Sequence, residues 1–212
     1  MIVTIDGPGG TGKSTVSRVV ADRSGLPHLD TGAFYRAATL AVVEAGVDPR
    51  DESAVLDVVQ RRSLGQEVGA MYLDGRDVSG EIRGDGVTAA VSAVSAHPLV
   101  RRELVERQRE WIEEHDGRGV IEGRDIGSVV FPDADVKVFL DASPEVRARR
   151  RAKETGEDFE AVLADLNRRD HLDSTRSASP LKIPDGAVVV DTSHLHFEEV
   201  VDRVLDLIGS RS

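Results

Sequence analysis

The sequence predicts an α/β fold in which a five-stranded parallel sheet is flanked by helices. Short apolar runs alternate with helical stretches along the chain, which is typical of parallel strands joined by helical crossovers. The first apolar run, residues 2–5, leads directly into the glycine-rich segment GPGGTGKST and then into a helical stretch. Polar clusters also follow other apolar runs, and the carboxyl ends of parallel strands meet at one edge of a sheet. We therefore expect a ligand site built from several loops at that edge.

The glycine-rich segment has the spacing of a P-loop: Gly, four residues, then Gly-Lys-Ser. Glycines allow successive backbone N–H groups to turn toward a phosphate, and the helix that starts near Lys13 adds the positive end of its dipole. We expect Lys13 to reach the β- and γ-phosphates of ATP and the Ser14 hydroxyl to bind Mg²⁺. The alternative is a glycine-rich turn without a ligand, but the Lys-Ser offset favours phosphate and a P-loop NTPase fold. The expected ATP-binding residues are Gly7, Pro8, Gly9, Gly10, Thr11, Gly12, Lys13, Ser14 and Thr15.

Composition narrows the class of protein. A length of 212 residues suits one domain with an inserted subdomain. A net charge of −11 argues against a protein that coats nucleic acid, and the lack of cysteine excludes disulfides and thiolate chemistry. No apolar stretch approaches membrane-spanning length, and no apolar leader precedes the first strand. We expect a soluble cytoplasmic monomer that binds neither nucleic acid nor a membrane.

The first half of the chain keeps the alternating rhythm and then breaks it. After the P-loop we expect a helix to Arg23 that stops at Gly25, a short strand at 26–29, and helices at 33–45 and 52–62. Residues 70–73 and 76–78 then predict two short strands around an Asp74-Gly75 hairpin turn. This antiparallel pair is our candidate for a small insert covering residues 63–95.

The second half returns to the alternating pattern. A helix at 87–96 precedes Pro98, which suits the first turn of the next helix. Trp111 lies in the apolar stripe of that helix, so we expect a core residue rather than a base-stacking platform. The six histidines show no metal-ligand spacing. The remaining expected elements are strands at 119–121, 135–140 and 187–190, and helices at 144–154, 158–173 and 197–208.

Arginines near the predicted strand ends are candidates for binding a ligand. Arg169, Asp173 and Arg176 are spaced to share one face of a helix. Alone, that spacing favours a solvated salt-bridge face. Arginines beside a P-loop, however, favour a second phosphate group, since guanidinium forks bind phosphate well. A second phosphate site indicates transfer between nucleotides rather than simple hydrolysis.

Several long segments resemble bacterial cytidylate kinases, members of the nucleoside monophosphate kinase family. They are GPGGTGKST, LDTGAFYR, DGRDVSGEIR, VSAVSAHPLVRRELVERQR, EGRDIGSVVFPDADVKVFLDAS and RRDHLDSTRSASPL. The resemblance covers nearly the whole chain and implies transfer of the γ-phosphate of ATP to CMP or dCMP in pyrimidine metabolism. It also implies a core at 1–30, 98–146 and 177–212, a monophosphate-binding region at 31–97 that includes the insert, and a lid at about 147–160.

The resemblance also implies roles for individual residues. Those matching the cytosine-binding positions are Ser92, Arg101 and Asp125. Those matching the CMP phosphate are Arg36, Arg124 and Arg169, of which Arg124 and Arg169 join Lys13 as catalytic residues. Asp173 matches the position that binds the sugar, with Arg176 beside it, and Asp30 and Thr31 belong to the acceptor pocket. Arg150, in the basic run 147–153 of the lid, is assigned to ATP.

Two departures from the family pattern leave roles open. Thr31 stands where many relatives have serine, and either hydroxyl can bond the substrate. Glu122 stands where relatives often have aspartate, so its role as an outer partner of Mg²⁺ stays open, as does the lid arginine that reaches the γ-phosphate. Two other functions also remain: a kinase for UMP or a small polyol, and a nucleotide-gated switch with slow hydrolysis.

Overall fold

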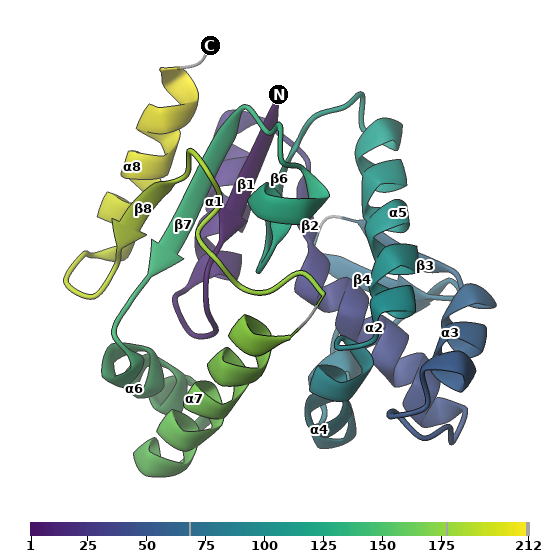
Figure 1. Ribbon diagram of the computed structural model, residues 1–212. Helices are drawn as coiled ribbons and strands as arrows, with labels where there is room; N and C mark the ends of the chain where they lie inside the picture. Colours follow the sequence, from purple (N-terminus) through teal and green to yellow (C-terminus); the bar gives the residue numbers. More distant parts are fainter. Residues whose placement is uncertain (68, 177, 211–212) are drawn as a thin grey trace. The chain divides into compact units, whose positions relative to one another are not determined.

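The computed structural model describes residues 1–67, 69–176 and 178–210, and the chain divides into two compact units (Figure 1). Unit 1 consists of Met1–Leu29 and Ile112–Ser212, and unit 2 of Asp30–Trp111. Apart from Asp30, the last residue of its first edge strand, the parallel sheet belongs to unit 1.

Unit 1 contains the predicted five-stranded parallel sheet, in the order β2-β6-β1-β7-β8. Its strands are β1 (Ile2–Asp6), β2 (His28–Asp30), β6 (Gly119–Gly123), β7 (Val136–Asp141) and β8 (Val188–Asp191). Its helices are α1 (Lys13–Ser24), α6 (Pro144–Thr155), α7 (Phe159–Thr175) and α8 (Phe197–Gly209), with a π-helical turn, η2 (Ile126–Val130). The central strand β1 pairs with β6 and β7, so the P-loop leaves the middle of the sheet.

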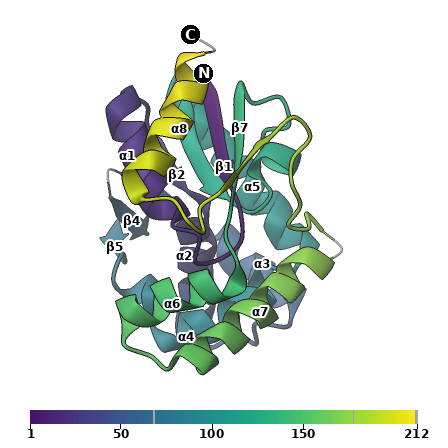
Figure 2. The same ribbon diagram turned by 90° about the vertical axis from the view of Figure 1, so that its left-hand side faces the viewer.

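Helices α1 and α8 lie side by side over one face of this sheet (Figures 1 and 2). The apolar positions of α8 recur at helical spacing, and Val201 and Val204 are fully buried against the sheet. Gly25 ends α1 in the left-handed conformation, as its position predicts. This core holds the start of α1, and with it Lys13, at the carboxyl end of β1.

Unit 2 is helical around a small antiparallel sheet. Its elements are α2 (Thr31–Glu44), α3 (Glu52–Gln60), β3 (Leu64–Glu67), β4 (Ala70–Leu73), β5 (Arg76–Asp77), η1 (Glu81–Arg83), α4 (Asp85–Val94) and most of α5 (Pro98–Glu114). Buried side chains of the four α-helices, such as Val42, Val59, Val94 and Leu104, form its core. Trp111 is buried, as predicted, and its Nε1 donates to the Gln66 carbonyl at 3.2 Å.

The hairpin turn was predicted correctly, whereas its sheet is larger than expected. Asp74 and Gly75 both have positive φ, 51° and 78°, as a two-residue hairpin turn requires. A third strand, β3, pairs with β4 and was not predicted, because its residues LGQE lack a β-branched alternation. Helix α2 begins at Thr31, earlier than expected, because the Asp30 carboxylate caps it by accepting the Ala33 N–H at 3.0 Å.

Candidate active site

The P-loop packs closely on the neighbouring strand. Gly7 has φ of 148°, and a Cβ placed there would lie 2.1 Å from the Leu140 carbonyl oxygen of β7. Within the loop, Thr11 Oγ1 and Lys13 Nζ both donate to the Pro8 carbonyl, at 3.1 and 2.7 Å. Gly12 precedes α1 at φ of 88° and has no side chain to cap it. The first N–H groups of α1 therefore suit an external anion.

Lys13 is buried, and its surroundings disfavour the charged ammonium. Burial, with a smaller contribution from the Arg124 guanidinium, lowers the pKa of Lys13 to about 7. The carboxylates of Glu122, Asp6 and Asp173 oppose this shift. An incoming polyphosphate would stabilise the protonated form, so the loop is prepared for a strongly anionic ligand.

Asp6 ties the end of β1 to the turn that follows β6. Its carboxylate accepts the N–H groups of Ile126 and Gly127 at 2.8 and 2.7 Å. These bonds hold the backbone directly after Arg124 and Asp125, both predicted site residues. Burial outweighs the two hydrogen bonds and raises the pKa of Asp6 to about 6.

We expect this carboxylate to make stability depend on pH. Because the folded pKa lies above the unfolded value of about 3.9, native Asp6 binds more protons between pH 4 and 6. Its contribution to the unfolding free energy is present below pH 4 and is lost as the pH rises through 6, by about 3 kcal/mol. Urea unfolding at pH 4.5 and 7 measures it, and Asp6→Asn should remove this part of the pH dependence. An unchanged pH dependence in Asp6→Asn would contradict the assignment.

Ser14 lies beside a buried carboxylate. Its Oγ donates to Glu122 Oε2 at 3.0 Å, and Glu122 is 2 % exposed. With its proton given to Glu122, the Ser14 hydroxyl has oxygen lone pairs left for a hard cation such as Mg²⁺. Among the described residues no cluster of three or more acidic or histidine side chains could hold a metal ion by itself. The Ser14 hydroxyl beside Glu122 fits a cation that is held mainly by substrate phosphates and water.

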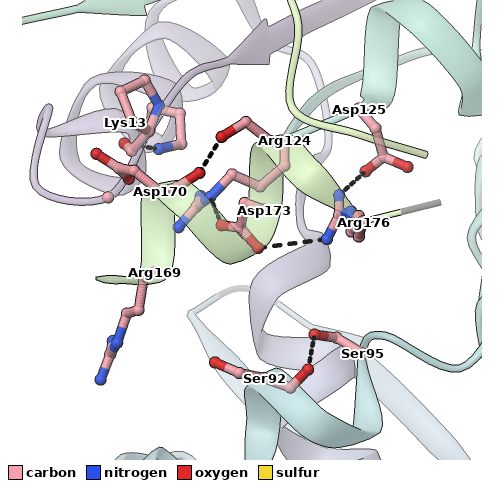
Figure 3. A network of polar contacts seen from close by, with 12 residues as sticks. Lys13, Ser92, Ser95, Arg124, Asp125, Arg169, Asp170, Asp173 and Arg176 are labelled. Atoms are coloured by element: carbon pink, nitrogen blue, oxygen red, sulfur yellow. Dashed lines mark hydrogen bonds and ion pairs between the residues drawn. The ribbon is translucent and has the colours of Figure 1, made fainter. Parts of the chain in front are cut away.

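The predicted site arginines of unit 1 separate into two groups, Arg124 with Arg176 and Arg169 by itself (Figure 3). Arg124 Nε lies 3.0 Å from Asp173 Oδ2, and Arg176 contacts Asp173 at 3.4 Å and Asp125 at 3.7 Å. Arg169 instead pairs with Asp165 at 2.9 Å and extends away from Arg124 and Asp173 (Figure 3). Asp173 and Arg176 contact each other, as their spacing predicts. Arg169 lies one turn before Asp173 in α7, and its ion-pair partner is Asp165, one turn earlier still. Arg176 is the C-cap residue of α7, with ψ of 143°.

The basic run of α6 is less exposed than its charge suggests. Arg147 is buried, donates to the carbonyls of Gly9 and Ala142 at 3.0 Å each, and pairs with Asp170 at 2.6 Å. Arg150 donates to the backbone and side chain of Thr192, after β8. The sequence did not predict the contact of Arg147 with the P-loop, because a run of seven mostly basic residues in a helix is typical of a solvent-exposed face.

Near these residues, unit 1 contains a cavity of about 620 Å³. Its lining includes Pro8 of the P-loop, Phe139, Ser143, Arg147 and Asp191. Apolar and polar groups meet there, as in pockets for small organic ligands.

The predicted site residues of unit 2 form their own contacts. Arg36 Nη1 donates to the Ile82 carbonyl and to Thr88 Oγ1, both at 3.2 Å. The Arg101 guanidinium lies 5.0 Å from the centre of the Tyr35 ring, and its Nη1 donates to the Ser95 carbonyl at 3.1 Å. Ser95 in turn donates to the Ser92 carbonyl at 3.3 Å (Figure 3). Arg101 is thus held by the backbone near Ser92, while Thr31 is buried at the start of α2.

A P-loop after the central strand of a five-stranded parallel sheet, with a buried lysine at its end, defines a P-loop phosphotransferase fold. A sugar kinase from Janibacter sp. HTCC2649 shares this fold, with a TM-score of 0.52 and 18% sequence identity over 98% of this chain and 94% of that one. The cytidylate kinase family model matches residues 3–210, and the chain belongs to the cytidylate kinase family.

Full-length relatives agree with this family. A cytidylate kinase from Rhodococcus opacus (strain B4) is 54% identical, covering 100% of this chain and 96% of its own. One from Mycobacterium leprae (strain Br4923) is 52% identical, covering 100% and 97%. No helix in the described part of the chain combines the length and apolar character needed to cross a membrane.

Proposed function

We propose that this chain transfers the γ-phosphoryl group of ATP to CMP or dCMP, giving ADP and CDP or dCDP. The observation that carries the proposal is the full-length match to cytidylate kinases, in a chain whose P-loop lysine and Arg124–Asp173–Arg176 cluster are buried or half-buried. The family resemblance supports a cytoplasmic enzyme, and the acidic composition favours a monomer.

ATP is assigned to unit 1. The P-loop N–H groups and Lys13 hold the phosphates, and the adjoining cavity has the size and mixed lining for the adenine. Mg²⁺, bound to the ATP phosphates, supplies charge neutralisation, and Ser14 with Glu122 behind it would contact this ion. Arg150 remains assigned to ATP, which would require it to leave Thr192.

The acceptor residues are assigned from the resemblance to cytidylate kinases. In unit 2, Arg36 binds the CMP phosphate, and Ser92 and Arg101 read the cytosine edge, with Asp30 and Thr31 in the same pocket. In unit 1, Arg124 and Arg169 bind the phosphate, Asp125 accepts from the cytosine amino group, and Asp173 and Arg176 hold the sugar. Cytosine has an N4 amino donor and acceptors at N3 and O2, so it requires an acid and donors together.

The reaction needs little proton transfer. A phosphate oxygen of CMP attacks the γ-phosphorus, and the bond from that phosphorus to the bridging oxygen of ADP breaks in line. The acceptor is already largely ionised at neutral pH, since its second pKa is about 6, so no general base is required. Lys13, Arg124 and Arg169 neutralise the transferring group, and the lid, residues 147–160, closes to exclude water.

The deciding experiment measures ADP formation from Mg²⁺-ATP with CMP, dCMP, UMP, AMP and GMP. Strong stimulation by CMP and dCMP supports the proposal. Equal rates with all bases, or a preference for UMP or a polyol, would favour a kinase for another acceptor. Phosphate release from ATP that is unaffected by CMP would favour a nucleotide-gated switch.

Arg101→Ala tests the cytosine assignment. Because Arg101 is held by Tyr35 and the Ser95 carbonyl and is assigned to the cytosine edge, we expect KM for CMP to rise by about 30-fold with ATP affinity unchanged. Steady-state kinetics and ATP titration measure the two. Arg102→Ala, an exposed neighbour on α5, is the matched control and should behave as the wild type. Equal loss of CMP and ATP binding in Arg101→Ala would remove Arg101 from the base pocket.

A further inference from the structure

A chain of polar contacts runs from the first edge strand of the parallel sheet to the P-loop. His28 lies at the start of β2, and its Nε2 is 3.3 Å from Glu122 Oε1. The other oxygen of Glu122, Oε2, accepts the proton of Ser14 Oγ at 3.0 Å. His28 Nε2 also lies 2.9 Å from Ser17 Oγ, one turn along α1 from Ser14. All four residues belong to unit 1.

The neighbours of Nε2 favour the His28 tautomer that carries its proton on that nitrogen. Ser17 Oγ donates to the Ser14 carbonyl at 3.4 Å, so its lone pairs face His28. Glu122 Oε1 is an acceptor as well. A proton on Nε2 suits both neighbours, because Ser17 Oγ can accept it and Glu122 Oε1 carries the opposite charge. His28 Nε2 thus lies within contact distance of both the Ser17 hydroxyl and the Glu122 carboxylate.

Glu122 needs such an anchor because it is a long, buried acid. Its side chain has three rotatable bonds and is almost fully buried. Lys13 is near enough for the charge of Glu122 to raise the pKa of that lysine, so the carboxylate has a competing partner on the P-loop. The contact of Oε1 with His28 Nε2, at 3.3 Å, favours the orientation in which Oε2 accepts from Ser14.

We propose that His28 is a positioning residue for phosphoryl transfer. Through Glu122 it keeps the Ser14 proton directed inward, so that the lone pairs of Ser14 Oγ stay available to the divalent cation of Mg²⁺-ATP. The inference rests on the proposed function, since it assigns Ser14 to the cation. His28 itself touches neither nucleotide nor metal.

A pair of substitutions tests this geometry. His28→Gln places its amide N–H where Nε2 stood, whereas His28→Asn is shorter and does not reach Glu122. We expect His28→Asn to raise the Mg²⁺ concentration for half-maximal turnover about tenfold and to lower kcat with KM for CMP unchanged. His28→Gln should restore values close to wild type. His194→Asn, at an exposed histidine, is the matched control for the substitution itself.

A binding measurement separates this role from activity. The affinity for a fluorescent, non-hydrolysable ATP analogue is measured with and without Mg²⁺. In His28→Asn we expect the tightening by Mg²⁺ to fall about tenfold while the metal-free affinity stays at the wild-type value. Ser17→Ala leaves the Nε2–H to Glu122 alone and should keep the wild-type response to Mg²⁺.

The outcomes distinguish the inference from its premise. Equal behaviour of His28→Asn and His28→Gln, or a loss of metal-free ATP affinity in both, would overturn the positioning role and leave only packing. A loss of the Mg²⁺ response in Ser17→Ala would overturn it as well, because Ser17 is not the link to Glu122. Absence of CMP-dependent ADP formation in the wild type would instead count against the proposed function, while the binding comparison would still stand.

Discussion

Lys13→Met is expected to lower kcat on the order of 10³-fold with every acceptor nucleotide. Lys13 is the buried cation of the P-loop, and its Nζ already lies on the loop backbone, 2.7 Å from the Pro8 carbonyl. During transfer, negative charge shifts toward the oxygen that bridges to ADP, and the ammonium is the only cation of the loop. Methionine keeps the length and apolar stem but loses that charge. Steady-state ADP formation with CMP and dCMP measures the loss, and a variant with substantial activity would contradict the P-loop mechanism.

The unfolding free energy of Lys13→Met is the control for its loss of activity. Burial lowers the pKa of Lys13 to about 7, whereas an unfolded lysine titrates near 10.4. Between these values the unfolded state binds more protons, so Lys13 makes the wild-type unfolding free energy rise with pH. Lys13→Met should lack this rise and should be no less stable than the wild type at pH 7. Loss of activity together with loss of folding would show that the substitution had tested packing instead of charge.

Gly7→Ala is expected to destabilise the fold by about 4 kcal/mol. A Cβ at Gly7 would lie 2.1 Å from the Leu140 carbonyl oxygen and 3.1 Å from its carbon, and both are backbone atoms in the core of the sheet. The φ of 148° adds strain, since residues with a side chain rarely adopt it. The loop can relieve the clash only by moving away from β7. Urea unfolding measures the loss, and a value below about 1 kcal/mol would contradict this close approach.

Gly12→Ala is the matched control for this prediction. Gly12 also has positive φ, 88°, but no atom lies within 4 Å of a Cβ built there. We expect only the cost of the left-handed conformation, about 1–2 kcal/mol. The difference between the two variants isolates the contact with Leu140.

Local signals predicted much of the fold. Alternating apolar runs predicted all five parallel strands, and Asp74-Gly75 predicted the hairpin turn. The sequence pattern missed β3, since its polar and glycine-containing residues become a strand only through pairing with β4. It also missed the π-helical turn η2, which depends on hydrogen bonds to Asp6, 120 residues away along the chain.

In the candidate site, too, some features could be predicted from local sequence and others could not. The P-loop could be predicted because its chemistry requires specific residue types at fixed spacing within nine residues. The partners of its arginines could not, because each pairing joins separate elements: Arg124 with Asp173, Arg147 with Gly9 and Asp170. Arg169 pairs within α7, with Asp165 four residues earlier, a helical neighbour that the sequence analysis did not name.

The α/β class, the phosphate-binding loop and the family could be predicted from the amino-acid sequence, because all three depend on short-range patterns or on similarity along the chain. The arrangement of charged side chains behind the P-loop became apparent only from the folded structure. In the fold, Lys13 is buried and its pKa falls to about 7, and Asp6 accepts hydrogen bonds from the turn after Arg124. Ser14 is linked through Glu122 to His28. These effects arise from burial and from contacts between residues that are distant in sequence. The spacing of residues along the chain predicts neither.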